Sequence, residues 1–401
     1  MRSLFRGLQP NARAWLAAAA CVGLGQQIFV VLRNQYLSDL GFTPVMISEV
    51  QASGGAAGLV AGILGLWMTR VLRLRTTLAF GVASNAIGFA LQVFSTTRLG
   101  FVLGASLAGL GIQGITMAAA PFLSRHSSIE GRVRLFTINA LAIQTLPGVV
   151  GALLGGQGQR LAARATGSAI GGYRFALFVG VVAVLFGLAP LLNIREEPPA
   201  KSSDRPRRLS LREPGRAAAL LLPDALVFFG SGLTIPFLQL YFKGRFGLSP
   251  SNIGGLYALM MAAGSIGHLL SPHLARRFGT GRVILGTQTL SLPFLAALLA
   301  AQSVPVAAAA FVLRQAIMSA SAPLYASLLH SRVAPEDSAP VAAHRMLVQS
   351  VVWAAAALLA GPLMTLDHGG FRAIIGGTLL AYAAGIVAGI VVFRRVQERV
   401  A

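Results

Sequence analysis

Long apolar stretches alternate with short polar or charged segments along almost the whole chain. A transmembrane helix needs about 20 mostly apolar residues, and Gly, Pro and charged residues divide the chain into twelve runs of about that length. This pattern predicts an all-α membrane protein with twelve transmembrane helices. We expect them at residues 15–37, 45–68, 76–95, 99–123, 134–156, 173–193, 217–242, 251–271, 283–302, 304–328, 341–366 and 371–393.

One long polar stretch, Asn193 to Arg216, separates the first six spans from the last six. Its seven basic residues, four acidic residues and four prolines leave too little apolar surface for it to fold alone. We therefore predict three parts: a six-helix bundle at 1–193, a cytoplasmic linker at 194–216, and a second six-helix bundle at 217–401.

The second half of the chain repeats the first. The sixth and twelfth spans both open with Gly-Gly-aromatic-Arg. The loops after spans one and seven match, and so do spans four and ten. The matched residues are Gly41, Pro44, Ile47, Gln113, Ile115 and Pro121 against Gly247, Pro250, Ile253, Gln315, Ile317 and Pro323. Because six is even, both halves enter the membrane from the same side, as in transporters built from two parallel six-helix repeats.

Composition and charge agree with a membrane protein. The chain is 55% hydrophobic and 11% charged, and its mean hydropathy is +0.70. The net charge of +21 would suggest nucleic acid for a soluble protein. With a cytoplasmic N-terminus, however, most Lys and Arg residues fall in cytoplasmic segments. Arg345, near the start of the expected span 341–366, is counted with Arg332 on the cytoplasmic side. The exceptions are Arg314 within a span and Arg33, Arg98, Arg160, Arg164, Arg174, Lys243, Arg245 and Arg372 outside.

This charge asymmetry follows the positive-inside rule. It predicts a multi-pass protein of the inner (cytoplasmic) membrane with both termini cytoplasmic and no nucleic-acid partner. The single cysteine, Cys21, excludes a disulfide framework. The apolar run continues past Cys21, so we expect an uncleaved first span rather than a secretory signal.

Two loops resemble the signature of the major facilitator superfamily, roughly Gly-x-Leu-Ala-Asp-Arg-x-Gly-Arg-Arg. The loop after span two has Gly65, Arg70 and Arg73 at matching positions, and the loop after span eight has Arg277, Gly279 and Arg282. The signature acid, which takes part in a charge latch in that family, is Thr69 in one copy and Arg276 in the other. The resemblance covers essentially the whole chain. It implies transport by alternating access, with spans one, four, seven and ten lining a mid-membrane cavity.

Those four spans contain amides and hydroxyls, which offer both hydrogen-bond donors and acceptors and suit a neutral or anionic polar ligand. Hydrogen bonding between helices of one half is the alternative role for any of these amides. We predict that the substrate site includes Gln26, Gln27, Asn34, Gln113, Thr234, Gln239, Arg314, Gln315 and Met318.

A cation in the middle of a span, such as Arg314, costs about 2.5 to 3.5 kcal/mol even on a lenient insertion scale. Arg314, Met318, Ser321 and Tyr325 are spaced as residues on one face of a helix. This spacing predicts that the four side chains form a stripe facing the cavity, with Arg314 as an anion-binding residue at one end. The alternatives are a structural ion pair with Asp224 or Glu49, or solvation in a wet cavity.

Only twelve acidic residues are present, and a proton-coupled carrier uses a titratable group within the membrane. Asp224 and Glu49 are therefore the predicted proton-coupling residues. Glu49 could instead pair with Arg33, and Asp224 could cap the start of its helix. His268 and His344 could also titrate.

No metalloprotease, serine-hydrolase, paired-carboxylate or phosphate-loop motif occurs in the sequence. We therefore expect no enzyme activity, no catalytic residues, no cofactor and no metal. The prediction is a monomeric secondary transporter for a small anionic or amphiphilic solute, in contact with membrane lipids and coupled to protons in the direction of export. The alternatives are an uptake symporter for nutrients or organic anions, a lipid flippase, and a membrane-embedded substrate sensor.

Overall fold

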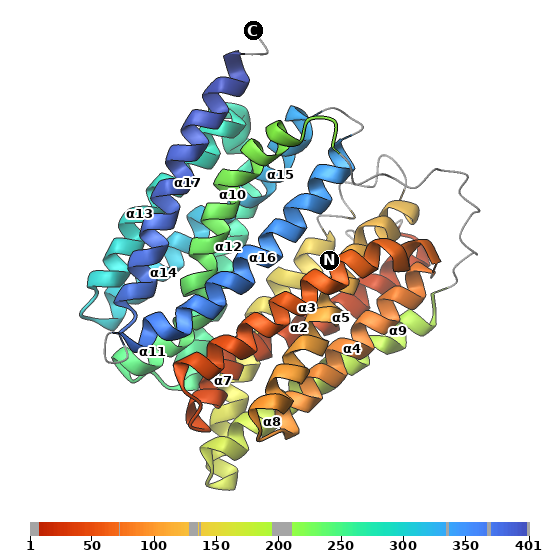
Figure 1. Cartoon of the computed structure of the whole chain (residues 1–401). Helices are drawn as coiled ribbons and strands as arrows, with labels where there is room; N and C mark the ends of the chain where they lie inside the picture. The colour runs from red at the N-terminus through yellow and green to blue at the C-terminus, as the bar shows by residue number, and fades with distance from the viewer. Residues whose placement is uncertain are drawn as a thin grey trace. The chain divides into compact units, whose positions relative to one another are not determined.

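The computed structural model describes residues 8–71, 73–127, 135, 138–194, 211–333, 337–366 and 370–398. These residues form helices joined by short connections and contain no β-strand (Figure 1). They divide into an N-terminal unit, Met1–Ser202 with Gly247–Ala258, and a C-terminal unit, Ser203–Phe246 with Leu259–Ala401. The predicted linker lies outside the described residues from 195 to 210, and the predicted bundle boundaries stay predictions.

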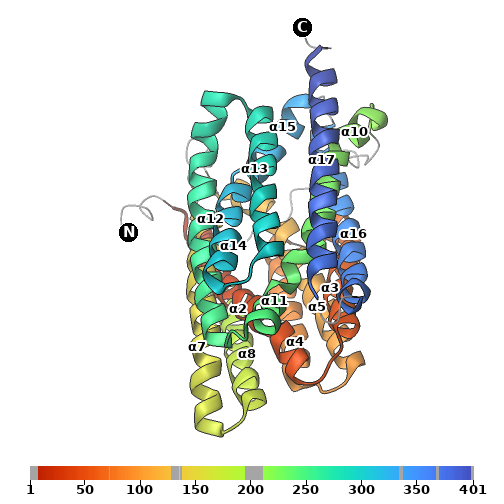
Figure 2. The same cartoon turned by 90° about the vertical axis from the view of Figure 1, so that its left-hand side faces the viewer.

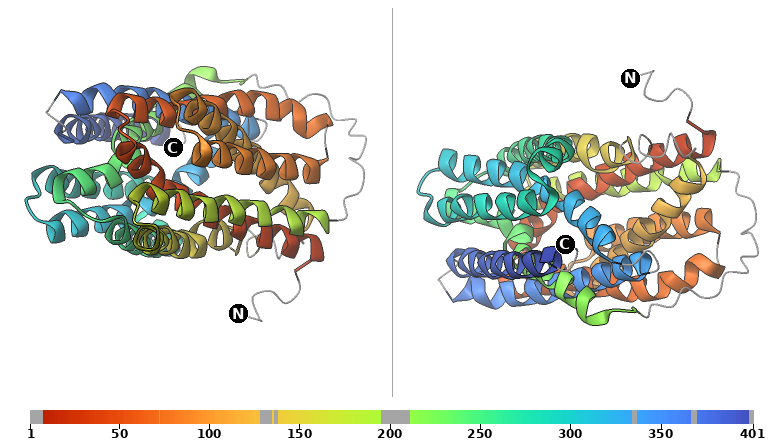
Figure 3. Two further views of the ribbon diagram at one scale, coloured as in Figure 1. Left: turned by 90° about the horizontal axis from the view of Figure 1, so that it is seen from below. Right: turned by 90° about the horizontal axis from the view of Figure 1, so that it is seen from above.

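The helices of the N-terminal unit follow one another in sequence order. Among them, α7 and α8 lie side by side (Figures 2 and 3). The helices are α2 (Pro10–Asp39), α3 (Pro44–Val71), α4 (Leu74–Phe94), α5 (Arg98–Arg125), a π-helical turn η1 (Leu141–Thr145) that runs into α7 (Leu146–Thr166), α8 (Ala169–Phe186) and α9 (Leu188–Leu192).

In the C-terminal unit, α10 packs against α16 and α17, and α13 packs against α14 and α17 (Figure 2). The beginning of α12 groups with the N-terminal unit. The helices are α10 (Pro214–Thr234), the 3₁₀ turn η2 (Ile235–Phe237), α11 (Leu238–Phe246), α12 (Pro250–Phe278), α13 (Thr280–Ala300), α14 (Val304–Ser319), α15 (Ser321–Arg332), α16 (Ser338–Thr365) and α17 (Arg372–Glu398).

Over the described residues, every expected span coincides with one of these helices or with a run of consecutive helical segments. Within the described residues, 11 helical segments are long and apolar enough to cross a membrane, and the remaining expected span, 45–68, coincides with α3. The predicted all-α membrane fold is confirmed. Some helices extend beyond the apolar pattern: α7 continues to Thr166, ten residues past the expected end, because polar residues can remain helical outside the hydrocarbon layer.

The sequence repeat corresponds to a repeated backbone conformation. Gly41 after α2 and Gly247 after α11 have φ angles of 87° and 63°, in the left-handed region that favours glycine. Three residues later, Pro44 and Pro250 begin α3 and α12, where the missing proline N–H is no loss. The matched glycines and prolines therefore make the same turn in both halves.

Glycines bring the backbones of α3, α4 and α5 into contact. A Cβ atom added at Gly109 of α5 would lie 2.1 Å from the carbonyl oxygen of Gly54 in α3. A Cβ atom at Gly88 of α4 would lie 2.4 Å from the backbone nitrogen of Ala108. Small residues allow this close approach where helices cannot rely on the hydrophobic effect to associate.

Two C-terminal spans that were expected to line a cavity are interrupted. The seventh span changes from α10 to α11 through η2, which contains Pro236. The tenth span breaks between Ser319 and Ser321, just before Pro323. Proline removes a backbone donor and disturbs the helix, and interrupted helices are common around transporter binding sites.

Candidate functional site

Arg314 of α14 is a buried cation with an incomplete set of partners. Its residue is 3% exposed, and its Nη2 donates a hydrogen bond to the hydroxyl of Tyr382 on α17. The guanidinium carbon also lies 5.4 Å from the centroid of the Tyr382 ring, a cation–π distance. The Nε atom is buried and has no hydrogen-bond partner. Within the described residues, no carboxylate forms an ion pair with Arg314.

Tyr382 connects Arg314 to α10. Its hydroxyl lies 2.7 Å from Ser231 Oγ. The ring is 0% exposed and packs against Gly230, where an added Cβ would lie 2.9 Å from a ring carbon. Met318, one turn after Arg314, packs against the apolar cluster that contains Tyr382. Three helices, α10, α14 and α17, therefore meet around one polar chain of Arg314, Tyr382 and Ser231.

The other C-terminal substrate candidates have local partners. Thr234 shares a 2.6 Å hydrogen bond with Thr378, one turn before Tyr382 on α17. Gln239 donates to the carbonyl oxygen of Pro236 at 2.8 Å, beyond the break in the span. Gln315 donates to Ser319 at 3.2 Å and faces Gly264 of α12. The structure thus brings Met318 and Thr234 near the Arg314 chain and places Gln239 and Gln315 elsewhere.

Four substrate candidates belong to the N-terminal unit. Gln26 and Gln113 are half-buried on α2 and α5. Gln27 is 9% exposed, and its Nε2 atom is buried without a hydrogen-bond partner. Asn34 accepts a 3.3 Å hydrogen bond from Arg33. Their roles in substrate binding stay predictions.

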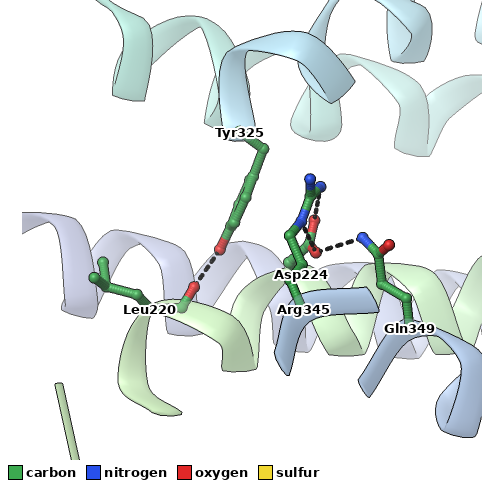
Figure 4. A network of polar contacts seen from close by, with 5 residues as sticks. All are labelled: Leu220, Asp224, Tyr325, Arg345 and Gln349. Carbon is green, nitrogen blue, oxygen red and sulfur yellow. Dashed lines mark hydrogen bonds and ion pairs between the residues drawn. The ribbon is translucent and has the colours of Figure 1, made fainter. Parts of the chain in front are cut away.

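Asp224 of α10 forms the second buried charge cluster (Figure 4). Its residue is 6% exposed. Arg345 of α16 donates to both carboxylate oxygens, at 2.8 and 3.1 Å, and Gln349 donates to one of them at 2.8 Å. Arg345 also lies over the ring of Tyr325 at 5.4 Å. The Tyr325 hydroxyl donates to the carbonyl oxygen of Leu220 at 2.7 Å. The carboxylate is thus bound by a cation and an amide within one unit.

These contacts correct three interpretations from the sequence. Arg345 was counted with the cytoplasmic connection, but it lies in α16, inside a segment apolar enough to span a membrane. Asp224 is not a helix cap, because α10 begins at Pro214 and Asp224 lies in its middle. The suggested ion pairs of Arg314 with Asp224 or Glu49 are wrong, since both acids bind other arginines.

The predicted stripe on span ten is also divided. The helix is interrupted after Ser319, and Ser321 Oγ donates to the carbonyl oxygen of Met318. Tyr325 is 2% exposed and belongs to an apolar cluster with Leu220 and Ile284. It packs in the core of the unit, separately from Arg314.

Glu49 lies in a partly exposed ion pair, and its second carboxylate oxygen, Oε2, is buried without a hydrogen-bond partner. Its carboxylate is 2.7 Å from Arg98, with side-chain exposures of 27% for Glu49 and 57% for Arg98. The suggested pairing with Arg33 is wrong, because Arg33 donates to Gln51 and Asn34 instead. Exposed pairs of this kind contribute little.

Replacing Glu49 by Gln is therefore expected to change the unfolding free energy by no more than about 1 kcal/mol and to leave transport unchanged. Thermal unfolding of the purified protein and solute accumulation in vesicles measure the two effects. Loss of transport in a stable Glu49→Gln protein would return Glu49 to the coupling site.

The residues of the two signature loops lie at or near the ends of the helices that the loops join, α3 and α4 in the first half and α12 and α13 in the second. Gly65 and Arg70 lie in α3, but their side chains are outside the described residues, and Arg73 is exposed at the start of α4. Gly279 has a φ of 86° between α12 and α13. Arg277 lies over the Phe278 ring at 5.3 Å. Arg282 is exposed and lines a pocket of about 350 Å³. A role of these residues in conformational change stays a prediction.

Sequence reasoning missed Arg345, Gln349 and Tyr382. Arg345 and Gln349 are four residues apart, which places both on one face of α16. Tyr382 is a single hydroxyl-bearing aromatic residue in an otherwise apolar stretch of span twelve. The sequence thus shows the spacing of Arg345 and Gln349 and the isolated Tyr382, but neither feature indicates which residue of another helix the side chains contact.

The family model described as Major Facilitator Superfamily matches residues 220–400, and a comparison with curated protein sequences found no match. Among solved structures, the chain is similar to a bacterial homolog of the human lysosomal transporter Spinster in an inward-facing and occupied conformation (TM-score 0.77, 15% identity, 96% of each chain covered). It is similar to a D-xylose-proton symporter (TM-score 0.72, 17% identity, 95% of this chain and 96% of that chain covered). It is also similar to the human organic anion transporter MFSD10 (TETRAN) (TM-score 0.64, 15% identity, 95% of this chain and 99% of that chain covered). At these identities, the structural likeness establishes the fold.

Proposed function

We propose that this chain is a proton-driven secondary transporter of the major facilitator type. The family model that matches residues 220–400 and the fold that the chain shares with solved transporters support this proposal. The protein moves a small organic solute across the membrane by alternating access, in the direction of export. Asp224 is the proposed proton-binding residue. The bidentate ion pair between Asp224 and Arg345 is the observation that carries this proposal.

An ionised carboxylate inside a membrane-spanning helix is costly unless it is paired and hydrogen-bonded. Arg345 and Gln349 provide that pairing from α16. A proton on Asp224 would cancel its charge and weaken the contact between α10 and α16. Proton binding and the packing of these two helices therefore compete, which is the requirement for coupling a proton to a conformational change.

Two similarities support this function. One structural neighbour is a D-xylose-proton symporter, and another is described among the proton-dependent oligopeptide transporters. The direction of export rests on analogy with compact members of this fold that have short loops.

Everted membrane vesicles test the proposal. Vesicles that contain the protein, energised to an acidic interior, are expected to accumulate at least one labelled solute from a panel of organic acids, amphiphiles and sugars. A protonophore should abolish the accumulation, and Asp224→Asn should reduce it to the level of vesicles without the protein.

Vesicles that contain Glu49→Gln are the matched control, because this change also neutralises a carboxylate but at an exposed pair. Accumulation only in right-side-out vesicles would contradict export. Full proton-driven accumulation by a folded Asp224→Asn protein would contradict the coupling role.

A further inference from the structure

We propose that the chain of Ser231, Tyr382 and Arg314 is the part of the transport site that binds the negatively charged group of an organic anion. The inference rests on the proposed transport function and adds the class of solute. Ser231 is the residue that contacts the anion. Arg314 is a positioning residue that acts through Tyr382 and supplies the positive charge.

The first step is the charge balance around Arg314. Its guanidinium is nine-tenths buried or more, and its Nε atom lacks a hydrogen-bond partner. Its hydrogen-bond partner on α17 is the neutral hydroxyl of Tyr382, and that hydroxyl is bonded in turn to the neutral hydroxyl of Ser231 on α10. Asp224, seven residues before Ser231 on α10, is about 10 Å away along the helix and is already bound to Arg345. The positive charge is therefore not compensated by any described residue.

The second step is the direction of the hydroxyl protons. Tyr382 accepts a hydrogen bond from Arg314, which only donates. The 2.7 Å bond between Tyr382 and Ser231 can run in either direction. We assign the tyrosine proton to it because Ser231 Oγ is the only other hydrogen-bond partner of the Tyr382 hydroxyl among the described residues. With its oxygen accepting that bond, Ser231 has its own proton left to donate. The chain thus ends in a hydroxyl that donates outward and has a cation behind it.

The third step is access. Arg314 and Tyr382 are 3% and 0% exposed, whereas Ser231 is only half-buried. Ser231 is therefore the member of the chain that a solute can contact without displacing the tyrosine ring. Gly230, beside Ser231, provides the space that the ring occupies.

These features select the chemistry of the solute. The exposed end of the chain donates, and the charge behind it is positive, so an acceptor-only group such as a carboxylate or sulfonate fits. An ammonium group offers only donors and would be repelled by Arg314. A neutral amide can accept from Ser231 but gains nothing from the buried charge.

The test is a thermal-shift titration of the full-length protein in detergent. The probes are benzoate, octanoate and indole-3-acetate, each compared with its neutral amide and its amine analogue at the same ionic strength. At least one acid is expected to raise the unfolding temperature, because a ligand that binds only the folded state stabilises it. The matching amide and amine are expected to bind at least about tenfold more weakly, equivalent to about 1.4 kcal/mol.

Variants locate the binding. Ser231→Ala, Tyr382→Phe and Arg314→Met are each expected to weaken acid binding by about tenfold or more, and Arg314→Lys should restore part of it because the charge returns. Ser291→Ala is the matched control, since it removes a buried hydroxyl that is bonded only to its own helix, and it should bind like the parent protein.

Three results would overturn the inference: no shift with any acid, equal shifts with the amides or amines, or acid binding that persists in Ser231→Ala and Arg314→Met. If Arg314→Met does not fold, Ser231→Ala and Tyr382→Phe decide the question, because both changes are small. The titration uses no proton gradient. A failure of anion binding is therefore distinct from a failure of proton-driven export in vesicles.

Discussion

The Arg345→Met protein is expected to lose about 3 to 5 kcal/mol of unfolding free energy, because removal of one partner leaves the other as an uncompensated buried charge. The carboxylate left behind, on Asp224, is 6% exposed and would keep only Gln349 as a donor. The stacking of the guanidinium on Tyr325 would be lost as well. Thermal unfolding of the detergent-purified protein measures the change.

The double variant Asp224→Asn with Arg345→Met is expected to recover much of this loss, since it removes both charges together. The control is Arg216→Met, which breaks the exposed pair with Glu213, whose side chains are 37% and 63% exposed. That change should cost less than about 1 kcal/mol. Equal stability of Arg345→Met and Arg216→Met would show that the buried pair is not the stabilising contact inferred here.

The Gly109→Ala protein is expected to be destabilised by about 1 to 3 kcal/mol, the usual cost of overpacking. The new Cβ would lie 2.1 Å from the carbonyl oxygen of Gly54 and 2.9 Å from its Cα. Both atoms belong to backbone, so α3 and α5 would have to move apart. The unfolding temperature of the purified protein measures this effect.

Gly114→Ala on the same helix is the matched control. The nearest atom to its new Cβ is 3.9 Å away, an ordinary contact, and alanine favours the helix over glycine by up to about 1 kcal/mol. The same substitution at two positions of α5 should therefore have opposite signs. Destabilisation of equal size at both positions would mean that helix backbone flexibility, and not close packing, decides the effect.

Sequence determined the properties that depend on local pattern. The number and order of the spans follow from the length of apolar sequence that a bilayer requires, and each expected span coincides, over its described residues, with one helix or with consecutive helical segments. The repeated turns at Gly41 and Gly247 also follow from the sequence, because only a few residue types tolerate their left-handed backbone. The sequence also singled out Arg314 and Asp224, since charge inside a span is costly wherever it lies.

Tertiary structure decided which charges meet. Asp224 and Arg345 are 121 residues apart, and Arg314 and Tyr382 are 68 apart, so the spacing of residues along one helix does not reveal either pair. The sequence pattern counted Arg345 with the cytoplasmic residues and offered Asp224 as a partner of Arg314. The packing of α10 against α16 and α17 instead gives each buried charge a different neighbour. The reason is physical: bilayer insertion depends on the composition of each segment separately, but pairing depends on which helix faces come together when the segments pack.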